Sequence, residues 1–283
     1  MDALQGSTTI RRVCAGSEGK ALFTLESDNR VTKRSNINAK KSFDVYLSEN
    51  ERLIYSILCL RGNVMIPERV AVLIKRRDLG VCDYELLVFE LDKKKKIDSV
   101  TFKDDGDSCL SVSFVELHSG EIVVNVGYRW IALVWKIGDQ NTRPLTTPSG
   151  SYITIDMNVL ENVLGRGEVL ALLFWRPRMV GIYAIEQNNL VLVQILALEF
   201  VPFSMLWIAS KHTLLVADGN GNNKEMFALR LTHHDAFPDK VTFEGYTNIR
   251  VRSWCVLPDL TGNEEKIILF DKNTNSLMKF HLA

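Results

Sequence analysis

The densest cluster of metal-ligand side chains in the sequence is His233-His234-Asp235. Neighbouring residues of a strand point to opposite faces, so the two histidines would rarely bind one ion. We therefore expect a solvated loop there, and neither a metal site nor a cofactor. A Ser or Cys nucleophile needs a base within hydrogen-bond reach, and the chain has no Gly-x-Ser-x-Gly elbow. We accordingly expect no catalytic residue and no enzyme.

Two glycine-rich segments and one basic run could bind anions. Gly165–Gly167 and Gly219–Asn223 are flanked by strand-forming residues, whereas a phosphate loop needs a helix behind its glycines. Tight hairpin turns explain both segments. Lys93–Lys96 is of the kind found in nuclear-import and polyanion sites, but it falls between two strand-like runs and is expected to be a solvated turn.

Composition indicates an ordinary globular protein. The 283 residues are 46% hydrophobic and include 34 basic and 34 acidic side chains, for a net charge of zero. These values exclude disordered, collagen-like and disulfide-stapled chains. Nucleic-acid binders usually carry a basic excess, so a nucleic-acid partner is expected less than a protein partner.

The cysteines predict a reducing compartment. They are odd in number and lack the close pairs of zinc and redox motifs. The five are Cys14, Cys59, Cys82, Cys109 and Cys255. Together with an N-terminus that has no apolar signal region, they favour reduced core thiols and an intracellular protein, cytoplasmic or nuclear.

One apolar stretch, residues 190–209, is long enough to cross a bilayer. Gln194, Glu199 and Pro202 lie in its middle, and a charged side chain at the centre of a span costs several kcal/mol. Two buried strands joined at Glu199–Pro202 are therefore expected instead of a membrane span.

Short apolar or alternating runs of five to nine residues recur along the whole chain, and none has a sustained helical period. The fold class is therefore predicted to be all-β. The runs fall into units of four antiparallel strands, of which the fourth is the most polar, and the units repeat about every 40 to 50 residues. One unit has the sequences SYITIDM, EVLALLFW, MVGIYAI and NLVLVQIL.

This repeating unit resembles the blades of the β-propeller superfamily, and the resemblance covers nearly all of the chain. It implies a single propeller domain, residues 1–283, with six blades, or seven if Phe43–Phe102 contains an additional set of strands. The last unit lacks a fourth strand, and Gly6–Ile10 could supply it and so close the ring.

No family motif within the propellers is present. The WD-repeat and kelch signatures are absent, and LLVADGNG at 214–221 is similar to a strand of NHL-type or gluconolactonase-type propellers at that one place. The gluconolactonase resemblance implies an alternative function, a hydrolase with a divalent ion at the central axis. Asn125, Asp156 and Asp218 are the polar residues near the relevant strands.

In a propeller, the loops between second and third strands emerge on one face. On three consecutive blades these loops would place arginines and tryptophans on a single arc. The predicted arc consists of Arg76, Arg77, Arg129, Trp130, Trp175, Arg176 and Arg178. Arginine forks bind carboxylates and phosphates, and Arg and Trp are enriched at interface hot spots.

The sequence thus predicts a non-catalytic interaction scaffold, a subunit of an intracellular complex, that binds an acidic or phosphorylated segment of a partner protein through the arc. A metal-dependent hydrolase and an RNA-binding propeller that stacks bases on the indoles are the alternatives. No membrane partner is expected.

Overall fold

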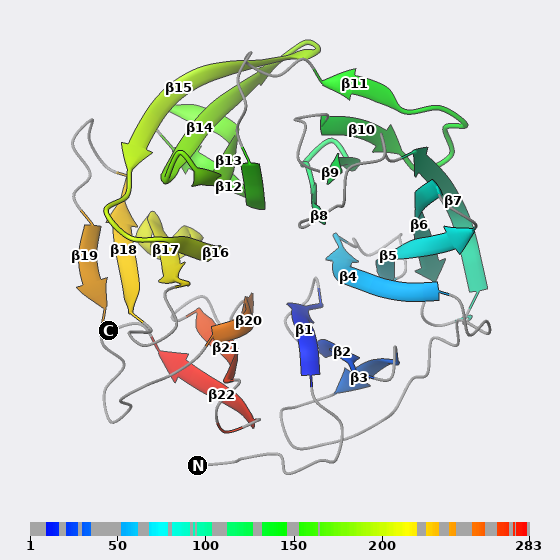
Figure 1. The fold of residues 1–283 in the computed structure, drawn as a ribbon, viewed down its shortest axis with the longest axis horizontal. Coiled ribbons are helices and arrows are strands. Elements are labelled where there is room, and N and C mark those ends of the chain that lie inside the picture. Colours follow the sequence, from blue (N-terminus) through cyan, green and yellow to red (C-terminus); the bar gives the residue numbers. More distant parts are fainter. Residues whose placement is uncertain are drawn as a thin grey trace. The chain divides into compact units, whose positions relative to one another are not determined.

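The structure is a computed structural model, and it is built almost entirely of β-strands (Figure 1). It describes residues 10–16, 21–27, 30–34, 52–61, 68–78, 81–90, 93, 95–103, 112–126, 132–145, 153–163, 165–219, 225–231, 238–241, 251–257, 265–271, 274 and 276–281. In these residues the strands form six antiparallel sheets of three or four strands, and one short 3-10 helix, Ala209–Lys211, precedes β17. The predicted all-β class is confirmed.

The chain divides into two compact units. The first comprises residues 1–103 and 249–283, and the second comprises residues 104–248. The strands of the first unit are β1 (Ile10–Ala15), β2 (Leu22–Glu26), β3 (Val31–Arg34), β4 (Arg52–Leu60), β5 (Arg69–Asp78), β6 (Val81–Glu90), β7 (Lys95–Lys103), β20 (Val251–Leu257), β21 (Lys266–Asp271) and β22 (Ser276–His281). They form the sheets β1-β2-β3, β4-β5-β6-β7 and β20-β21-β22.

The second unit contains three four-stranded sheets, whose colours in Figure 1 run from green through yellow to the orange of β19. Its strands are β8 (Val112–Glu116), β9 (Glu121–Val126), β10 (Ala132–Lys136), β11 (Arg143–Leu145), β12 (Ile153–Val163), β13 (Arg166–Arg176), β14 (Met179–Glu186), β15 (Asn189–Ala197), β16 (Pro202–Ile208), β17 (Thr213–Asp218), β18 (Met226–Arg230) and β19 (Pro238–Val241). In every sheet, consecutive strands are neighbours, as in a meander.

Within each unit, the first strands of the three sheets lie side by side. In the second unit β12 contacts both β8 and β16, and in the first unit β1 contacts both β20 and β4. The earliest and latest described parts of the chain therefore pack together. The predicted strand at Gly6–Ile10 lies outside the described residues except for Ile10, which belongs to β1. Residues 43–51 of the segment Phe43–Phe102 lie outside them as well.

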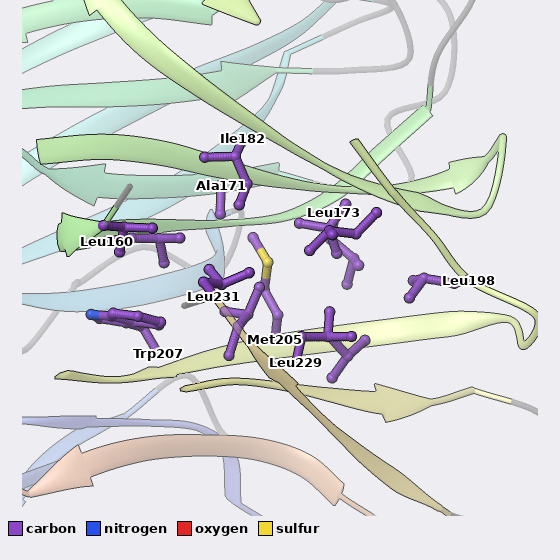
Figure 2. Close-up of a cluster of buried hydrophobic side chains, with 14 of the residues drawn as sticks. Leu160, Ala171, Leu173, Ile182, Leu198, Met205, Trp207, Leu229 and Leu231 are labelled. Carbon is purple, nitrogen blue, oxygen red and sulfur yellow. The ribbon is translucent and has the colours of Figure 1, made fainter. Parts of the chain in front are cut away.

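Apolar residues on both faces of β13 explain why this run is continuously hydrophobic. Val169, Ala171 and Leu173 pack toward the sheet of β16, in the cluster shown in Figure 2. Leu170, Leu172 and Phe174 pack on the other face, toward the sheet of β8. The period of two therefore separates one apolar run into two cores.

Gly181 of β14 is required by the packing of the neighbouring Tyr183. A Cβ at position 181 would lie 2.6 Å from Cε2 of the buried Tyr183 ring. The missing side chain gives that ring its space.

An additional residue interrupts the pairing of the first strand with the second in five of the six sheets, within the part of the chain that the structure describes. These β-bulge residues are Arg11, Tyr55, Ile155, Phe203 and Arg252. Each bulge lies at the end of its sheet where the second strand turns into the third. Successive bulges are roughly 45 to 50 residues apart, or twice that across β8, as expected of a structural repeat.

The residue directly after the bulge can bind the next sheet. Asp156 Oδ2 accepts hydrogen bonds from Ser204 Oγ (2.7 Å) and from the backbone N–H of Met205 (2.9 Å). In the first unit, Ser253 Oγ accepts a hydrogen bond from the backbone N–H of Val13 (3.0 Å). Each donor is the second residue after the bulge of its own strand: Met205 follows the bulge residue Phe203, and Val13 follows the bulge residue Arg11. We call this hydrogen bond between two bulged first strands the seam. It joins β12 to β16 and β20 to β1.

The stretch 190–209 consists of β15 and β16, and no helix in the described residues is long and apolar enough to cross a membrane. The prediction of two strands is confirmed, but the expected burial of both is wrong. β15 is the outer strand of its sheet, and Ile195 is 52% exposed. The expectation that each fourth strand is the most polar also fails at β15, which contains no charged residue.

We predict that Asp156→Ala destabilises the protein by about 2 to 3 kcal/mol, because the N–H of Met205 and the hydroxyl of Ser204 lose a charged acceptor. Urea unfolding followed by circular dichroism measures this change. Glu186→Ala is the matched control, since its exposed pair with Arg166 (3.3 Å) is worth about 1 kcal/mol or less. Equal stability of the two variants would contradict the structural role of the seam.

Candidate functional site

The turn between β13 and β14 exposes two arginines beside an indole. Arg176 and Arg178 are both exposed, and Trp175 is half-buried. The guanidinium carbon of Arg176 lies 4.9 Å from the centre of the Trp175 ring, so a cation–π contact holds the guanidinium over the indole. The peptide bond between Arg176 and Pro177 is cis.

The connection from β15 to β16 is hydrogen-bonded to the β13–β14 turn and to Gly219, which follows β17. The N–H of Leu198 donates to the carbonyl of Arg178 (2.9 Å), and the N–H of Gly219 donates to the carbonyl of Val201 (2.7 Å). Residues 198–201 thus link the β13–β14 turn to the end of β17.

Phe203 adds an exposed apolar ring to this end of the second unit. It is the bulge residue of β16 and is 47% exposed. Its Cβ would lie 3.3 Å from a Cβ built on Gly219, so the two backbones approach closely. We call Trp175, Arg176, Arg178 and Phe203 the Trp175 surface.

The two arginines of the Trp175 surface have no ion-pair partner among the residues that the structure describes. Other arginines do have acidic partners: Arg34 binds Glu26 (2.9 Å), and Arg143 binds Glu121 (2.9 Å). Guanidinium groups without a carboxylate keep their donors for an incoming anion. The surface therefore combines free anion-binding donors with an aromatic platform.

The remaining residues of the predicted arc have different outcomes. Arg129 and Trp130 lie outside the described residues. Arg76 and Arg77 were expected in a loop, but they belong to β5, where they pair with Asp83 and Cys82 of β6. The backbone ladder extends to Asp78, because the strand pairing and not the charge of the residues sets the end of β5. The full arc stays a prediction.

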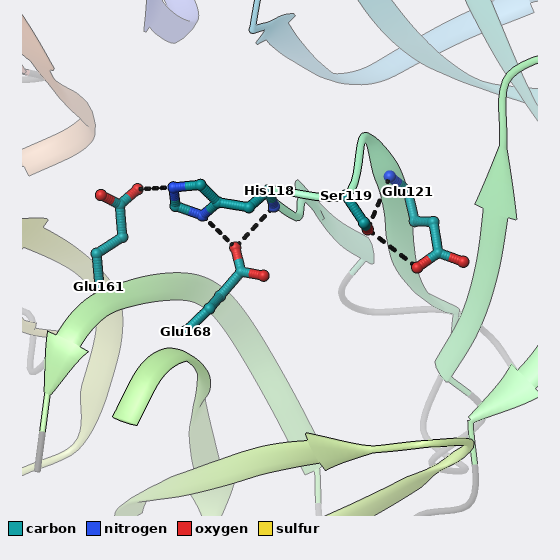
Figure 3. Close-up of polar contacts among 5 residues, drawn as sticks. All are labelled: His118, Ser119, Glu121, Glu161 and Glu168. Carbon is teal, nitrogen blue, oxygen red and sulfur yellow. Dashed lines mark hydrogen bonds and ion pairs between the residues drawn. The ribbon is translucent and has the colours of Figure 1, made fainter. Parts of the chain in front are cut away.

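A second polar cluster joins two sheets of the second unit (Figure 3). His118, in the turn after β8, lies between two carboxylates: Nδ1 is 2.8 Å from Glu168 Oε1, and Nε2 is 3.6 Å from Glu161 Oε1. Glu168 Oε1 also accepts the backbone N–H of His118 (2.8 Å). The imidazole thus attaches the β8–β9 turn to β12 and β13.

A neighbouring ion pair is centred on Glu121. Its carboxylate is paired with Arg143, and Ser119 Oγ donates to it (3.0 Å). Partial burial tends to raise the pKa of Glu121, but the hydrogen bonds from Arg143 and Ser119 outweigh it and lower the pKa. Glu121 therefore stays ionised as a structural anion.

The three residues considered for a divalent ion lie in three different strands and are not gathered at one site. Asp156 is engaged in the seam to β16, Asn125 is buried in β9, and Asp218 ends β17. Within the described ranges no three His, Cys, Asp or Glu side chains gather so that they could hold an ion. The predicted loop at His233-His234-Asp235 lies outside those ranges.

The other motifs have structural places. Gly165 (φ 72°) forms the tight turn between β12 and β13, so the hairpin prediction for Gly165–Gly167 is confirmed. Residues 220–223 of the second glycine-rich segment lie outside the described part. Lys93 is in a turn and pairs with Glu90 (2.8 Å), while Lys95 and Lys96 are exposed at the start of β7.

The described cysteines, Cys14, Cys59 and Cys255, are free thiols and lie in β1, β4 and β20. Cys14 and Cys59 come together at 3.2 Å between their Sγ atoms, a contact that their sequence separation did not reveal. Burial raises the pKa of Cys59 well above its ordinary value, and the Cys14 thiol raises it further. Burial also raises the pKa of Cys255.

Comparison of the chain with models of known protein families and with curated proteins finds no match. Function must therefore be inferred from the side chains of the site itself. The sequence pointed to the turn at Trp175–Arg178, but it gave no signal for Phe203, because that residue lies inside an apolar run.

We predict that the stability of the protein falls as the pH rises above about 8.5, the range in which thiols of the unfolded chain ionise. The buried thiols of Cys59 and Cys255 keep their protons in the folded state, so unfolding releases protons there. Urea unfolding between about pH 8 and pH 10 measures the slope of the unfolding free energy. Cys255→Ala should flatten this slope, and Glu186→Ala should leave it unchanged. An unchanged slope in Cys255→Ala contradicts the prediction.

Proposed function

We propose that this protein is a non-catalytic interaction scaffold that binds an acidic or phosphorylated segment of a partner protein through the Trp175 surface. The observation that carries the proposal is Arg176, exposed over the Trp175 ring without an acidic partner in the described part of the chain. A stacked guanidinium loses little conformational entropy when its donors bind a carboxylate or phosphate.

Arg178 and Phe203 extend this surface in ways that suit a peptide. Arg178 offers a second fork one residue beyond Pro177, so two adjacent anionic groups could be bound at once. Phe203 offers apolar area, as the centres of protein interfaces do. The free thiols of the first unit fit the predicted location of such an assembly inside the cell.

The scaffold that we propose is a six-bladed β-propeller. Six consecutive meanders, first strands side by side within each unit, and bulges at a regular interval all support it. The strongest support is the repeated seam. The hydrogen bond from Val13 to Ser253, in the first and last meanders, is equivalent to the bond from Met205 to Asp156 between consecutive ones.

Small-angle X-ray scattering tests the propeller. A closed ring of 283 residues should have a radius of gyration of about 19 Å and a single-peaked distance distribution. The measurement is made at a concentration at which the protein is monomeric. A bimodal distribution, as two separated units would produce, contradicts a single propeller.

Charge reversal tests the binding surface. Arg176→Glu combined with Arg178→Glu should weaken partner binding at least tenfold, because both forks then repel an anionic segment. Affinity purification with mass spectrometry compares the proteins that bind to wild type and variant, and a thermal melt should show nearly unchanged stability. Arg166→Glu, at the other end of β13, is the control and should retain the partners. Retained partners in the double variant would overturn the proposal.

A further inference from the structure

Two cysteines from different sheets of the first unit bring their sulfur atoms into contact. Cys14 lies in β1 and Cys59 lies in β4, and their Sγ atoms are 3.2 Å apart. Both side chains are free thiols, and either one can donate the hydrogen bond between them. The contact therefore holds two reduced sulfur atoms next to each other, as the formation of a disulfide requires.

A disulfide would need only a small movement of these side chains. Its S–S bond is about 2.05 Å long, so the two sulfur atoms, now 3.2 Å apart, must approach by roughly 1.2 Å. The strands β1 and β4 contact each other directly, so their backbones already lie close together. Rotations about the two Cα–Cβ bonds, within the ordinary width of a rotamer well, move a sulfur atom on this scale.

The third described thiol, Cys255, packs on the other side of β1. Cys14 and Phe23 belong to the apolar cluster between the sheet of β1 and the sheet of β4. Val13 and Cys255 belong to a different cluster, between the sheet of β1 and the sheet of β20. Since neighbouring residues of a strand point to opposite faces, the pleat of β1 directs Cys14 toward Cys59 and away from Cys255.

The two thiols differ in their exposure to solvent. Cys59 is half-buried, whereas Cys14 is only 8% exposed. An oxidant that arrives from solvent therefore reaches Cys59 first. Cys14 lies behind it, in the place of a thiol that resolves the oxidised sulfur before it is oxidised further.

The surroundings of Cys59 set how fast it reacts. Burial raises the pKa of Cys59 most, and the neighbouring Cys14, Glu68 and Cys255 raise it further. Glu68 is itself paired with Lys33 (2.7 Å). A thiol must lose its proton before it attacks an oxidant, so Cys59 reacts slowly at neutral pH and faster as the pH rises.

We propose that Cys14 and Cys59 form a redox modification site, at which a hydroperoxide converts the two thiols into a disulfide that joins β1 to β4. With hydrogen peroxide, the thiolate of Cys59 attacks one oxygen, the O–O bond breaks, the sulfur is oxidised to a sulfenic acid and hydroxide leaves. The thiolate of Cys14 then attacks that sulfur, so the S–S bond forms and the S–O bond breaks to release a second hydroxide. The protons lost by the two thiols convert both hydroxides into water.

This modification is independent of the binding role proposed for the Trp175 surface. Cys14 and Cys59 lie in the first unit of the chain, whereas the Trp175 surface lies in the second. The disulfide would add a covalent link between two strands that are 45 residues apart at the cysteines and that otherwise meet through apolar side chains and the thiol hydrogen bond.

Oxidation of the folded full chain tests the proposal. The protein is treated with hydrogen peroxide, the remaining thiols are alkylated, and the peptides are analysed by mass spectrometry without reduction. We expect a peptide pair joined by Cys14 and Cys59, which dithiothreitol separates again. The pair should form at least tenfold faster at about pH 9 than at about pH 7, because the thiolate fraction rises with pH.

Two serine variants separate this site from a general oxidation of thiols. Cys255→Ser is the matched control and should form the disulfide at the rate of wild type. Cys14→Ser removes the resolving thiol, so sulfenic and sulfinic acid should accumulate at Cys59. Far-UV circular dichroism confirms that both variants are folded.

Three results would overturn the proposal. The first is that Cys14 and Cys59 both stay reduced in the peroxide-treated wild type at either pH. The second is a disulfide that joins either of them to a different cysteine instead. The third is a bond between Cys14 and Cys59 that forms only after the protein has been unfolded in urea, since the folded contact would then not be its source.

Discussion

At one junction between sheets in each unit, a side chain directly after a β-bulge accepts the backbone N–H of the first strand of the neighbouring sheet. Asp156 makes this bond to Met205, and Ser253 makes it to Val13. The apolar clusters between sheets provide most of the driving force, but hydrophobic contact has no direction. A hydrogen bond to a particular N–H is directional, and it therefore sets the register in which one sheet packs on another.

The bulge links this packing to the exposed surface. An additional residue bends the strand and leaves one side chain outside the ladder, while the following residue is directed differently from its regular neighbours. In β16 the additional residue is Phe203, which is exposed, and the following residue is Ser204, which is buried and bonded to Asp156. The same local irregularity thus supplies both a structural contact and a part of the Trp175 surface.

Much of the fold could be predicted from hydrophobic periodicity alone. The runs EVLALLFW, MVGIYAI and NLVLVQIL were recognised as strands, and they form β13, β14 and β15 with bounds that differ by at most two residues. The bulges could not be predicted, because residues as different as Arg11, Ile155 and Phe203 occupy them. A bulge depends on the pairing of two strands, and one run of sequence does not contain that information.

The candidate site was predictable in part for a related reason. Trp175 and Arg176 mark a turn between two strong apolar runs, and a turn of this kind is visible in the sequence. Arg76 and Arg77 follow a similar run but lie in a strand, because residues of β6 continue the ladder beside them. Charge indicates exposure of a side chain, but it does not show where the backbone ladder ends.

β13 and β15 show why apolar content alone does not reveal burial. Both are long runs rich in Leu and Val, yet β13 has a sheet on each face and a strand on each side, whereas β15 is the last described strand of its sheet. Lysine or proline at an outer edge opposes pairing with another chain, and β15 is without either. The apolar side chains of β15 are therefore exposed because of the place of this strand at the edge of its described sheet, although its composition resembles that of β13.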